Sequence, residues 1–253
     1  MSSSSGTLRR IVLLDELRGL AILLMVFYHA CYDIVYIFGV DFPFFNTPFM
    51  HYLQVFIASN FVIISGISCR FSHSNLKRGA FAFSFGLLLT AFTLIFIPSQ
   101  AVLFGVLHLL GAGMMLFALC RPLLDRLHPL VGTLLFVLLF RFTLYVPYGM
   151  LGYPPLAINL PTSLYEAGYL FALGFPAPSF FSSDYFPLVP WLFLFFAGSC
   201  LGVYFKEGRC PELFYNPRIP AFSVVGRYSM WIYLFHQPIT YGILWVIFSV
   251  IRA

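Results

Sequence analysis

One apolar segment near the amino terminus carries four ionisable side chains that could do chemistry. Residues 14–38 are hydrophobic enough to cross a membrane, yet they include Asp15, Arg18, His29 and Asp33. At ~100° per residue, these four side chains fall within about 60° of one another on one face of a helix. Because ionisable groups inside a membrane are costly, we expect this face to point into protein or a hydrated cavity. The face is therefore a candidate functional site.

The residue types on this face suit proton transfer and anion binding. His29 titrates near neutral pH, and Asp33 lies one helical turn away, as in pairs where a carboxylate orients a base. Arg18 is a permanent cation whose planar fork fits phosphate or carboxylate. Two structural interpretations stay open. Arg18 and Asp15 could simply neutralise each other, and His29 could be a hydrogen-bonded packing residue.

Histidines also interrupt two later apolar runs. His108 lies about seven residues below the outer start of the fourth predicted span, and His236 about eight above the inner start of the seventh. Both therefore reach a depth similar to that of His29, which predicts a shared, hydrated cavity near the membrane midplane. For His108 and His236 singly, a structural role is an equal alternative. His51 and Gln54 begin the second span near the outer surface, where they could face an acceptor substrate.

Composition places the chain among integral membrane proteins. Of its 253 residues, 60% are hydrophobic and only 9% are charged, whereas soluble domains carry about 25% charged residues. The net charge of +5 does not indicate nucleic-acid binding, because no soluble basic module exists to carry it. The five cysteines show no metal-ligand spacing and are expected to be free thiols. Without a zinc signature, Walker-type loop or glycine-rich dinucleotide turn, no metal is expected.

The elements that must position these side chains are membrane helices. Apolar runs of about 18–25 residues predict an all-α, polytopic integral membrane helical bundle of about seven transmembrane helices. The predicted spans are residues 14–38, 50–69, 80–97, 101–119, 129–147, 187–205 and 228–250.

The distribution of basic residues predicts the orientation. With the N-terminus in the cytoplasm, eleven of the fourteen lysines and arginines lie on the cytoplasmic side, as the positive-inside rule requires. Residues 1–10 then form a short cytoplasmic N-terminus, and residues 148–186 form a long extracytoplasmic loop. Residues 164–173 within that loop are expected to form a short interfacial or re-entrant helix. No repeat divides the chain, so we expect one domain over residues 1–253.

Five motifs carry a resemblance to a known group. The first helix, with LDELRGLA at residues 14–21 and MVFYH at 25–29, is similar to that of the transmembrane acyltransferase superfamily. Two further runs, DYFPLVPW at 184–191 and GRYSMWIYLFHQP at 226–238, are similar to its heparan-alpha-glucosaminide N-acetyltransferase branch and small bacterial relatives. The run FGVLHLLG at 104–111 also fits this resemblance.

The resemblance implies an acyl-CoA-dependent acyltransferase working across the bilayer. Cytoplasmic acyl-CoA, with acetyl-CoA as the first expectation, would donate its acyl group to an amine or hydroxyl of an extracytoplasmic, sugar-like acceptor. The CoA phosphates would be held by Arg18 together with Arg70, Lys77 or Arg78. Saccharide or amino-sugar acceptors, acyl-CoA and the lipid bilayer are thus the expected partners, and a homodimer is an open option for assembly.

The resemblance also implies catalytic roles. The polysaccharide-modifying branch has a basic residue, ten intervening residues and a histidine, which Arg18 and His29 match. His29 would be the general base, oriented by Asp33. The predicted membrane depth of His236 and Gln237, rather than the resemblance, makes one of them the expected donor to the developing oxyanion. In the heparan branch the catalytic histidine lies in the loop after the first shared helix. His51 is nearest to that place, so the base is either His29 or His51.

Two other function classes remain. A transporter of a small anion or of protons through a histidine-lined cavity would explain intramembrane histidines equally well. The absence of an inverted repeat counts mildly against many transporter folds. A non-catalytic scaffold of a cell-envelope complex would leave the polar face of the first helix unexplained. The expected location is a bacterial inner (plasma) membrane.

Overall fold

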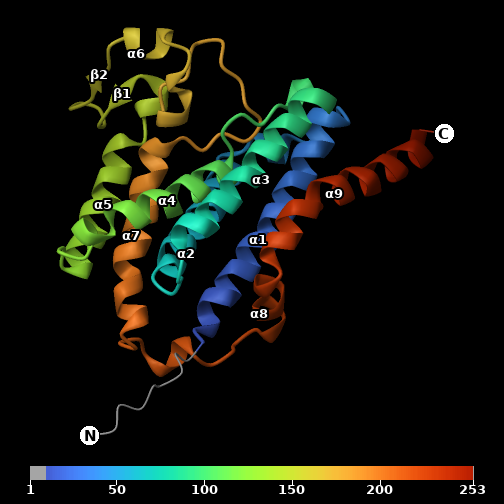
Figure 1. Cartoon of the computed structure of the whole chain (residues 1–253). Helices are drawn as coiled ribbons and strands as arrows, with labels where there is room; N and C mark the ends of the chain where they lie inside the picture. The colour runs from blue at the N-terminus through green and yellow to red at the C-terminus, as the bar shows by residue number, and fades with distance from the viewer. Residues whose placement is uncertain (1–9, 253) are drawn as a thin grey trace, which may run out of the picture. The chain divides into compact units, whose positions relative to one another are not determined.

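The fold is built from long apolar helices (Figure 1). The computed structural model describes residues 10–252. Within these residues, seven helices are long and apolar enough to cross a membrane. They are α1 (Val12–Tyr32), α2 (Pro48–Cys69), α3 (Asn75–Phe96), α4 (Val106–Leu124), α5 (Pro129–Thr143), α7 (Leu188–Lys206) and α9 (Ser229–Arg252).

Short elements connect these helices. A π-helix, η1, extends the first span, and one further helix, α8, precedes the last span. The short elements are η1 (Asp33–Ile37), η2 (Pro43–Asn46), η3 (Pro98–Gln100), η4 (Val146–Tyr148), β1 (Met150–Leu151), β2 (Ile158–Asn159), α6 (Ser163–Glu166), η5 (Leu170–Leu173), η6 (Glu212–Phe214) and α8 (Pro220–Arg227).

The all-α membrane class and the seven spans are confirmed, whereas some span boundaries are wrong. The third span was expected from residue 80, but α3 begins at Asn75. The fourth span was expected over residues 101–119, but α4 begins at Val106. The chain before it is extended, because Phe104 forms a parallel bridge with Tyr185. Hydropathy sums apolar residues and does not distinguish this strand-like segment from the helix that follows it. Residues 1–9 of the expected cytoplasmic N-terminus lie outside the described residues.

The described residues divide into two compact units. The first unit contains the residues up to 61 and those from 210 onward, and the second contains residues 62–209. In the first unit, α1 packs against α8 and α9, and Figure 1 shows these helices in blue and red. In the second unit, α3 packs against α4 and α5 against α7.

Helix α8 was not expected from the sequence, and α1 holds it through backbone contacts. The Glu16 carboxylate accepts hydrogen bonds from the backbone N–H groups of Arg218 and Ile219 at 2.7 and 2.8 Å. Those groups precede α8, so the carboxylate satisfies donors at a helix start and suits its positive dipole. Glycines allow the close approach: a Cβ at Gly19 would lie 1.9 Å from the Phe222 carbonyl oxygen.

The second unit has a core of aromatic and aliphatic side chains from α2, α4, α5 and α7. Phe117, Leu109, Phe195 and Val62 are completely buried there. Gly198 of α7 lets the helix approach the α2 backbone, since a Cβ would lie 2.3 Å from the Ile63 carbonyl oxygen. This packing fixes the ends of the helices that carry the basic residues.

The loop over residues 148–186 has little regular structure. Strands β1 and β2 pair antiparallel, with Met150 opposite Asn159. The single short helix expected over 164–173 is wrong, because two separate turns, α6 and η5, occupy that stretch. Gly168 between them has φ +69°, a left-handed conformation that interrupts a helix.

Candidate functional site

Two helices of the first unit bring together four of the predicted site residues. The imidazole centres of His29 on α1 and His236 on α9 lie 4.9 Å apart. One turn beyond His29, the side chain of Asp33 is fully buried and accepts a hydrogen bond from Gln237 Nε2 at 2.6 Å. We call His29, Asp33, His236 and Gln237 the polar cluster.

Hydrogen bonding determines which nitrogen of His236 can accept a proton. His236 Nδ1 lies 2.7 Å from the backbone carbonyl oxygen of Tyr233. Because a carbonyl oxygen can only accept a hydrogen bond, Nδ1 must carry the hydrogen. This tautomer is assigned from the hydrogen-bond partner of the ring. In the neutral ring, Nε2 then presents a lone pair. His236 Nε2 is therefore poised as a base.

The polar cluster contains three buried acceptor atoms without partners. His236 Nε2, Asp33 Oδ2 and Gln237 Oε1 have no hydrogen-bond partner among the described residues. Buried polar groups are normally paired, and leaving one unpaired costs about 1–3 kcal/mol. Three unsatisfied acceptors in one place call for a ligand rich in N–H or O–H groups, or for water.

The hydrogen-bond partner of the Asp33 carboxylate differs from His29, the partner that the sequence predicts. Its hydrogen bond comes from Gln237, 204 residues away, and among the described residues the His29 ring does not bond to it. The backbone changes from α-helix to π-helix at Asp33, which alters the register of side chains along the face. His29 instead lies against the ring of His236.

Arg18 and the second-helix residues lie apart from these contacts. Arg18 Nη1 donates to Asp15 Oδ1 at 3.0 Å, and Asp15 also pairs with Arg10 at 2.6 Å. The expected Asp15–Arg18 neutralisation is thus present. His51 and Gln54 lie in the first turns of α2, and both side chains are exposed.

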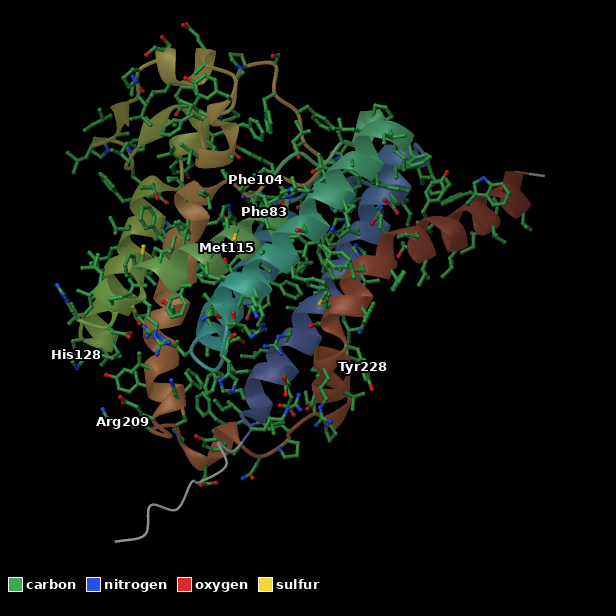
Figure 2. All side chains as sticks on the ribbon, in the orientation of Figure 1. Phe83, Phe104, Met115, His128, Arg209 and Tyr228 are labelled. Atoms are coloured by element: carbon green, nitrogen blue, oxygen red, sulfur yellow. The ribbon has the colours of Figure 1, made fainter. Side chains whose placement is uncertain are left out.

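His108 belongs to the second unit and has a partner for each ring nitrogen. Nδ1 accepts from the Gly105 backbone N–H at 3.2 Å, and Nε2 lies 3.4 Å from the Thr90 hydroxyl. Phe83 and Phe104, both labelled in Figure 2, contact the ring with centroids 5.3 Å away. These contacts stabilise the start of α4 and leave His108 no free nitrogen for a substrate.

The three predicted CoA contacts of the second unit differ in exposure. Arg70 is 5% exposed; it donates to the Ser199 carbonyl oxygen at 2.7 Å and pairs with Asp125. Lys77 and Arg78 are exposed in the first turn of α3. Asp125 was missed by the sequence reasoning, because an aspartate in a basic loop has no local feature that reveals its partner.

Asp184 is a further residue that sequence reasoning did not single out. Its Oδ2 accepts the Val106 backbone N–H at 3.0 Å and so stabilises the first turn of α4. Burial raises the pKa of this carboxyl to about 6, while the Val106 hydrogen bond acts to lower it. No group of three or more histidine, cysteine or acidic residues that could hold a metal occurs among the described residues.

The fold and the polar cluster define a multi-pass integral membrane protein with a buried polar site in its helices. The model of the family described as "Heparan-alpha-glucosaminide N-acetyltransferase, catalytic" matches residues 10–238. The chain therefore belongs to this family, and its class of chemistry is that of a membrane acyltransferase. No curated protein and no solved structure matches it significantly.

Proposed function

We propose that this protein transfers an acyl group from acyl-CoA, first of all acetyl-CoA, to an amine or hydroxyl of a sugar-like acceptor. The family supplies the transferase class. The observation that carries the proposal is the set of three unpartnered acceptor atoms in the polar cluster. An amino or hydroxyl group is the nucleophile of such a transfer, and its N–H or O–H would satisfy these atoms.

His236 Nε2 is the proposed general base. As the acceptor nitrogen or oxygen attacks the thioester carbonyl carbon, its proton moves to Nε2. The tetrahedral intermediate then collapses, the C–S bond breaks, and the CoA sulfur leaves with the proton from the imidazolium. Asp33 Oδ2 and Gln237 Oε1 would hold the remaining hydrogens of the acceptor. His29, in ring contact with His236, is the second candidate base.

The acyl donor is proposed to approach from the side of the basic residues. About 16 Å of helix separates Arg18 from His29, a distance suited to an extended pantetheine arm. Arg18 is the proposed phosphate contact in the first unit, and the exposed Lys77 and Arg78 are those in the second. Arg70 is less available, since Asp125 and Ser199 already engage its guanidinium. We place the protein in a bacterial plasma membrane.

Release of free CoA thiol from acetyl-CoA by the purified protein, with glucosamine as acceptor, tests the proposal. His236→Gln is expected to lower the acceptor-dependent rate by about 10²–10⁴-fold, the usual contribution of a general base. His128→Gln is the matched control, because His128 is exposed in the loop before α5. Asp33→Asn keeps an oxygen for the Gln237 hydrogen bond but removes the carboxylate, and we expect a loss of at least about 10-fold.

Three variants separate the candidate bases. A larger loss in His29→Gln than in His236→Gln would move the base to His29, and a loss confined to His51→Gln would favour the alternative in the second helix. Normal rates in all three histidine variants would contradict catalysis by these imidazoles. Solute flux into liposomes without any acyl donor, abolished by Asp33→Asn, would instead favour a transporter.

A further inference from the structure

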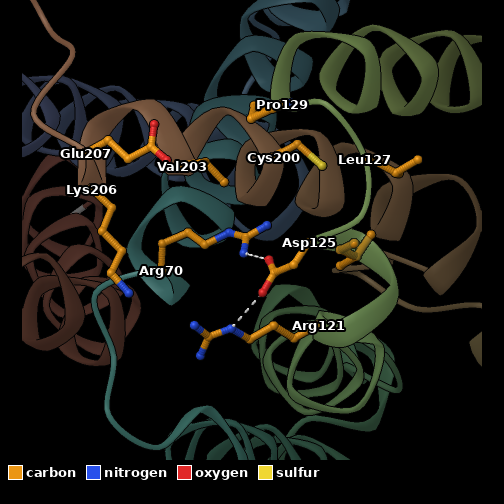
Figure 3. Close-up of a pocket in the computed structure, with 10 residues that line it drawn as sticks. Arg70, Arg121, Asp125, Leu127, Pro129, Cys200, Val203, Lys206 and Glu207 are labelled. Carbon is orange, nitrogen blue, oxygen red and sulfur yellow. Dashed lines mark hydrogen bonds and ion pairs between the residues drawn. The ribbon is translucent and has the colours of Figure 1, made fainter.

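A second polar site lies entirely within the second unit. A pocket of about 520 Å³ is lined by residues from the ends of α2, α4, α5 and α7 (Figure 3). Three cations line it: Arg70, Arg121 and Lys206. Two acidic residues, Asp125 and Glu207, also line it. None of these residues belongs to the polar cluster of the first unit.

The acidic residues do not neutralise the pocket. Asp125 is shared, since its two oxygens pair with Arg70 and with Arg121 Nε at 3.3 Å. Glu207 pairs with Arg209 at 3.2 Å. Among the described residues, Lys206 makes no ion pair. The lining therefore carries three cations against two carboxylates, one of which is already paired with a further cation, Arg209, which leaves an excess of positive charge for an anion.

Arg70 offers an unused donor in this site. Its side chain is nearly fully buried, and Figure 3 shows its guanidinium extending among the lining residues toward Asp125. The Nη2 atom has no hydrogen-bond partner among the described residues. A buried, unpaired charged donor is costly, so a ligand oxygen there would be stabilising.

The walls of the pocket indicate a membrane lipid rather than a free solute. Leu124, Leu127 and Val203 line it beside the cations. Leu123 and Leu130, each next in sequence to a lining residue, are 64% and 56% exposed. Such surfaces accommodate acyl chains, and basic pockets between transmembrane helices on the cytoplasmic side suit lipid phosphate groups. The positive-inside prediction puts these helix ends on that side.

We propose that this pocket binds the phosphate headgroup of an anionic phospholipid. Arg121 and Lys206 supply exposed charge, and Arg70 supplies the buried donor. This site does not depend on the catalytic proposal, because its residues are separate from the polar cluster. The phosphates of CoA share the same chemistry, so the experiment must distinguish the two sources.

Thermal unfolding of the purified protein in neutral detergent tests this inference. Short-chain phosphatidylglycerol is titrated against short-chain phosphatidylcholine, and free CoA forms a separate arm. We expect phosphatidylglycerol to raise the midpoint more than phosphatidylcholine. The double variant Arg121→Gln/Lys206→Gln should weaken the apparent affinity for phosphatidylglycerol about 10-fold or more, since each cation near an anionic lipid contributes measurably. Both side chains are exposed, so the variant should fold.

Arg126→Gln is the matched control, because Arg126 is an exposed cation of the same loop that does not line the pocket. It should bind phosphatidylglycerol as the wild type does. Equal responses to the two lipids, or an equal loss in Arg126→Gln, would overturn the proposal. Loss of CoA binding with unchanged phosphatidylglycerol binding in the double variant would also overturn it and assign the pocket to the nucleotide.

Discussion

Asp184 shows how one carboxyl can couple helix capping to pH. It accepts the Val106 N–H at the start of α4, where a negative charge is favourable. Burial opposes that charge and raises the pKa to about 6. Gly105 makes room for the contact, since a Cβ there would lie 2.2 Å from Asp184 Oδ2. The residue therefore holds the loop after residue 180 against α4.

The raised pKa of Asp184 predicts a decrease in stability as pH rises. An unfolded aspartate loses its proton near pH 4, whereas the folded carboxyl keeps it to about pH 6. Unfolding therefore releases a proton between these values, and stability falls across that window and levels off above it. Asp184→Asn still accepts the Val106 hydrogen bond but does not titrate. The unfolding midpoint of this variant minus that of the wild type should therefore increase between pH 4 and pH 7. A difference that does not change with pH would contradict the prediction.

At the scale of elements, the LDELRGLA motif acts as a clamp for α8. The Glu16 carboxylate accepts hydrogen bonds from the backbone N–H groups that precede α8, and Gly19 lies against the Phe222 backbone. From the other side, a Cβ at Gly226 would lie 1.9 Å from the Asp15 carbonyl oxygen. Two motifs at opposite ends of the sequence thus meet in one helix contact. The contact involves α1, which carries His29, and α8, which directly precedes the helix α9 that carries His236 and Gln237.

Adding one methyl group at this contact should therefore be destabilising. In Gly226→Ala the new Cβ meets backbone, which can retreat only if α1 and α8 separate. We expect a loss of about 1–3 kcal/mol or more, measured as a lower unfolding midpoint in detergent. Gly242→Ala is the control, because no heavy atom lies within 4 Å of its Cβ position in α9. That variant should be unchanged or more stable by about 0.5–1 kcal/mol, and equal losses in both would refute the clamp.

At the scale of the whole molecule, function depends on which side of the membrane each loop faces. The proposed transfer needs the basic helix ends on the donor side and the 148–186 loop on the other. Seven membrane-crossing helices place the loop before α3 and the loop after α5 on opposite sides. Only the positive-inside rule indicates which of the two is cytoplasmic.

Cysteine labelling in intact cells tests that orientation. All five cysteines are free in the structure and would be replaced by serine or alanine first. His73→Cys and Tyr169→Cys then place single thiols in the two loops, and both positions are exposed. A membrane-impermeant maleimide should label the Tyr169→Cys variant directly and the His73→Cys variant only after permeabilisation. The reverse pattern would invert the proposed path of the acyl group.

The membrane class and the seven spans could be predicted from the sequence alone, because crossing a bilayer requires about 20 apolar residues in a row and that is a local property. The sequence also identified His29, Asp33, His236 and Gln237 one by one, since polar side chains are conspicuous in apolar helices. It did not indicate α8, whose position depends on Glu16 and Gly19 of α1 and on Gly226 of α8 itself.

The pairing of these residues could not be predicted, because it joins positions that are far apart in the chain. Asp33 and Gln237 are 204 residues apart, and Glu16 and Arg218 are 202 apart. The tertiary structure also separated His108, whose nitrogens stabilise the start of α4, from the two histidines that meet. The physical reason is that hydrogen bonds depend on distance and direction between helices, which the sum of side-chain hydrophobicity along a chain does not contain.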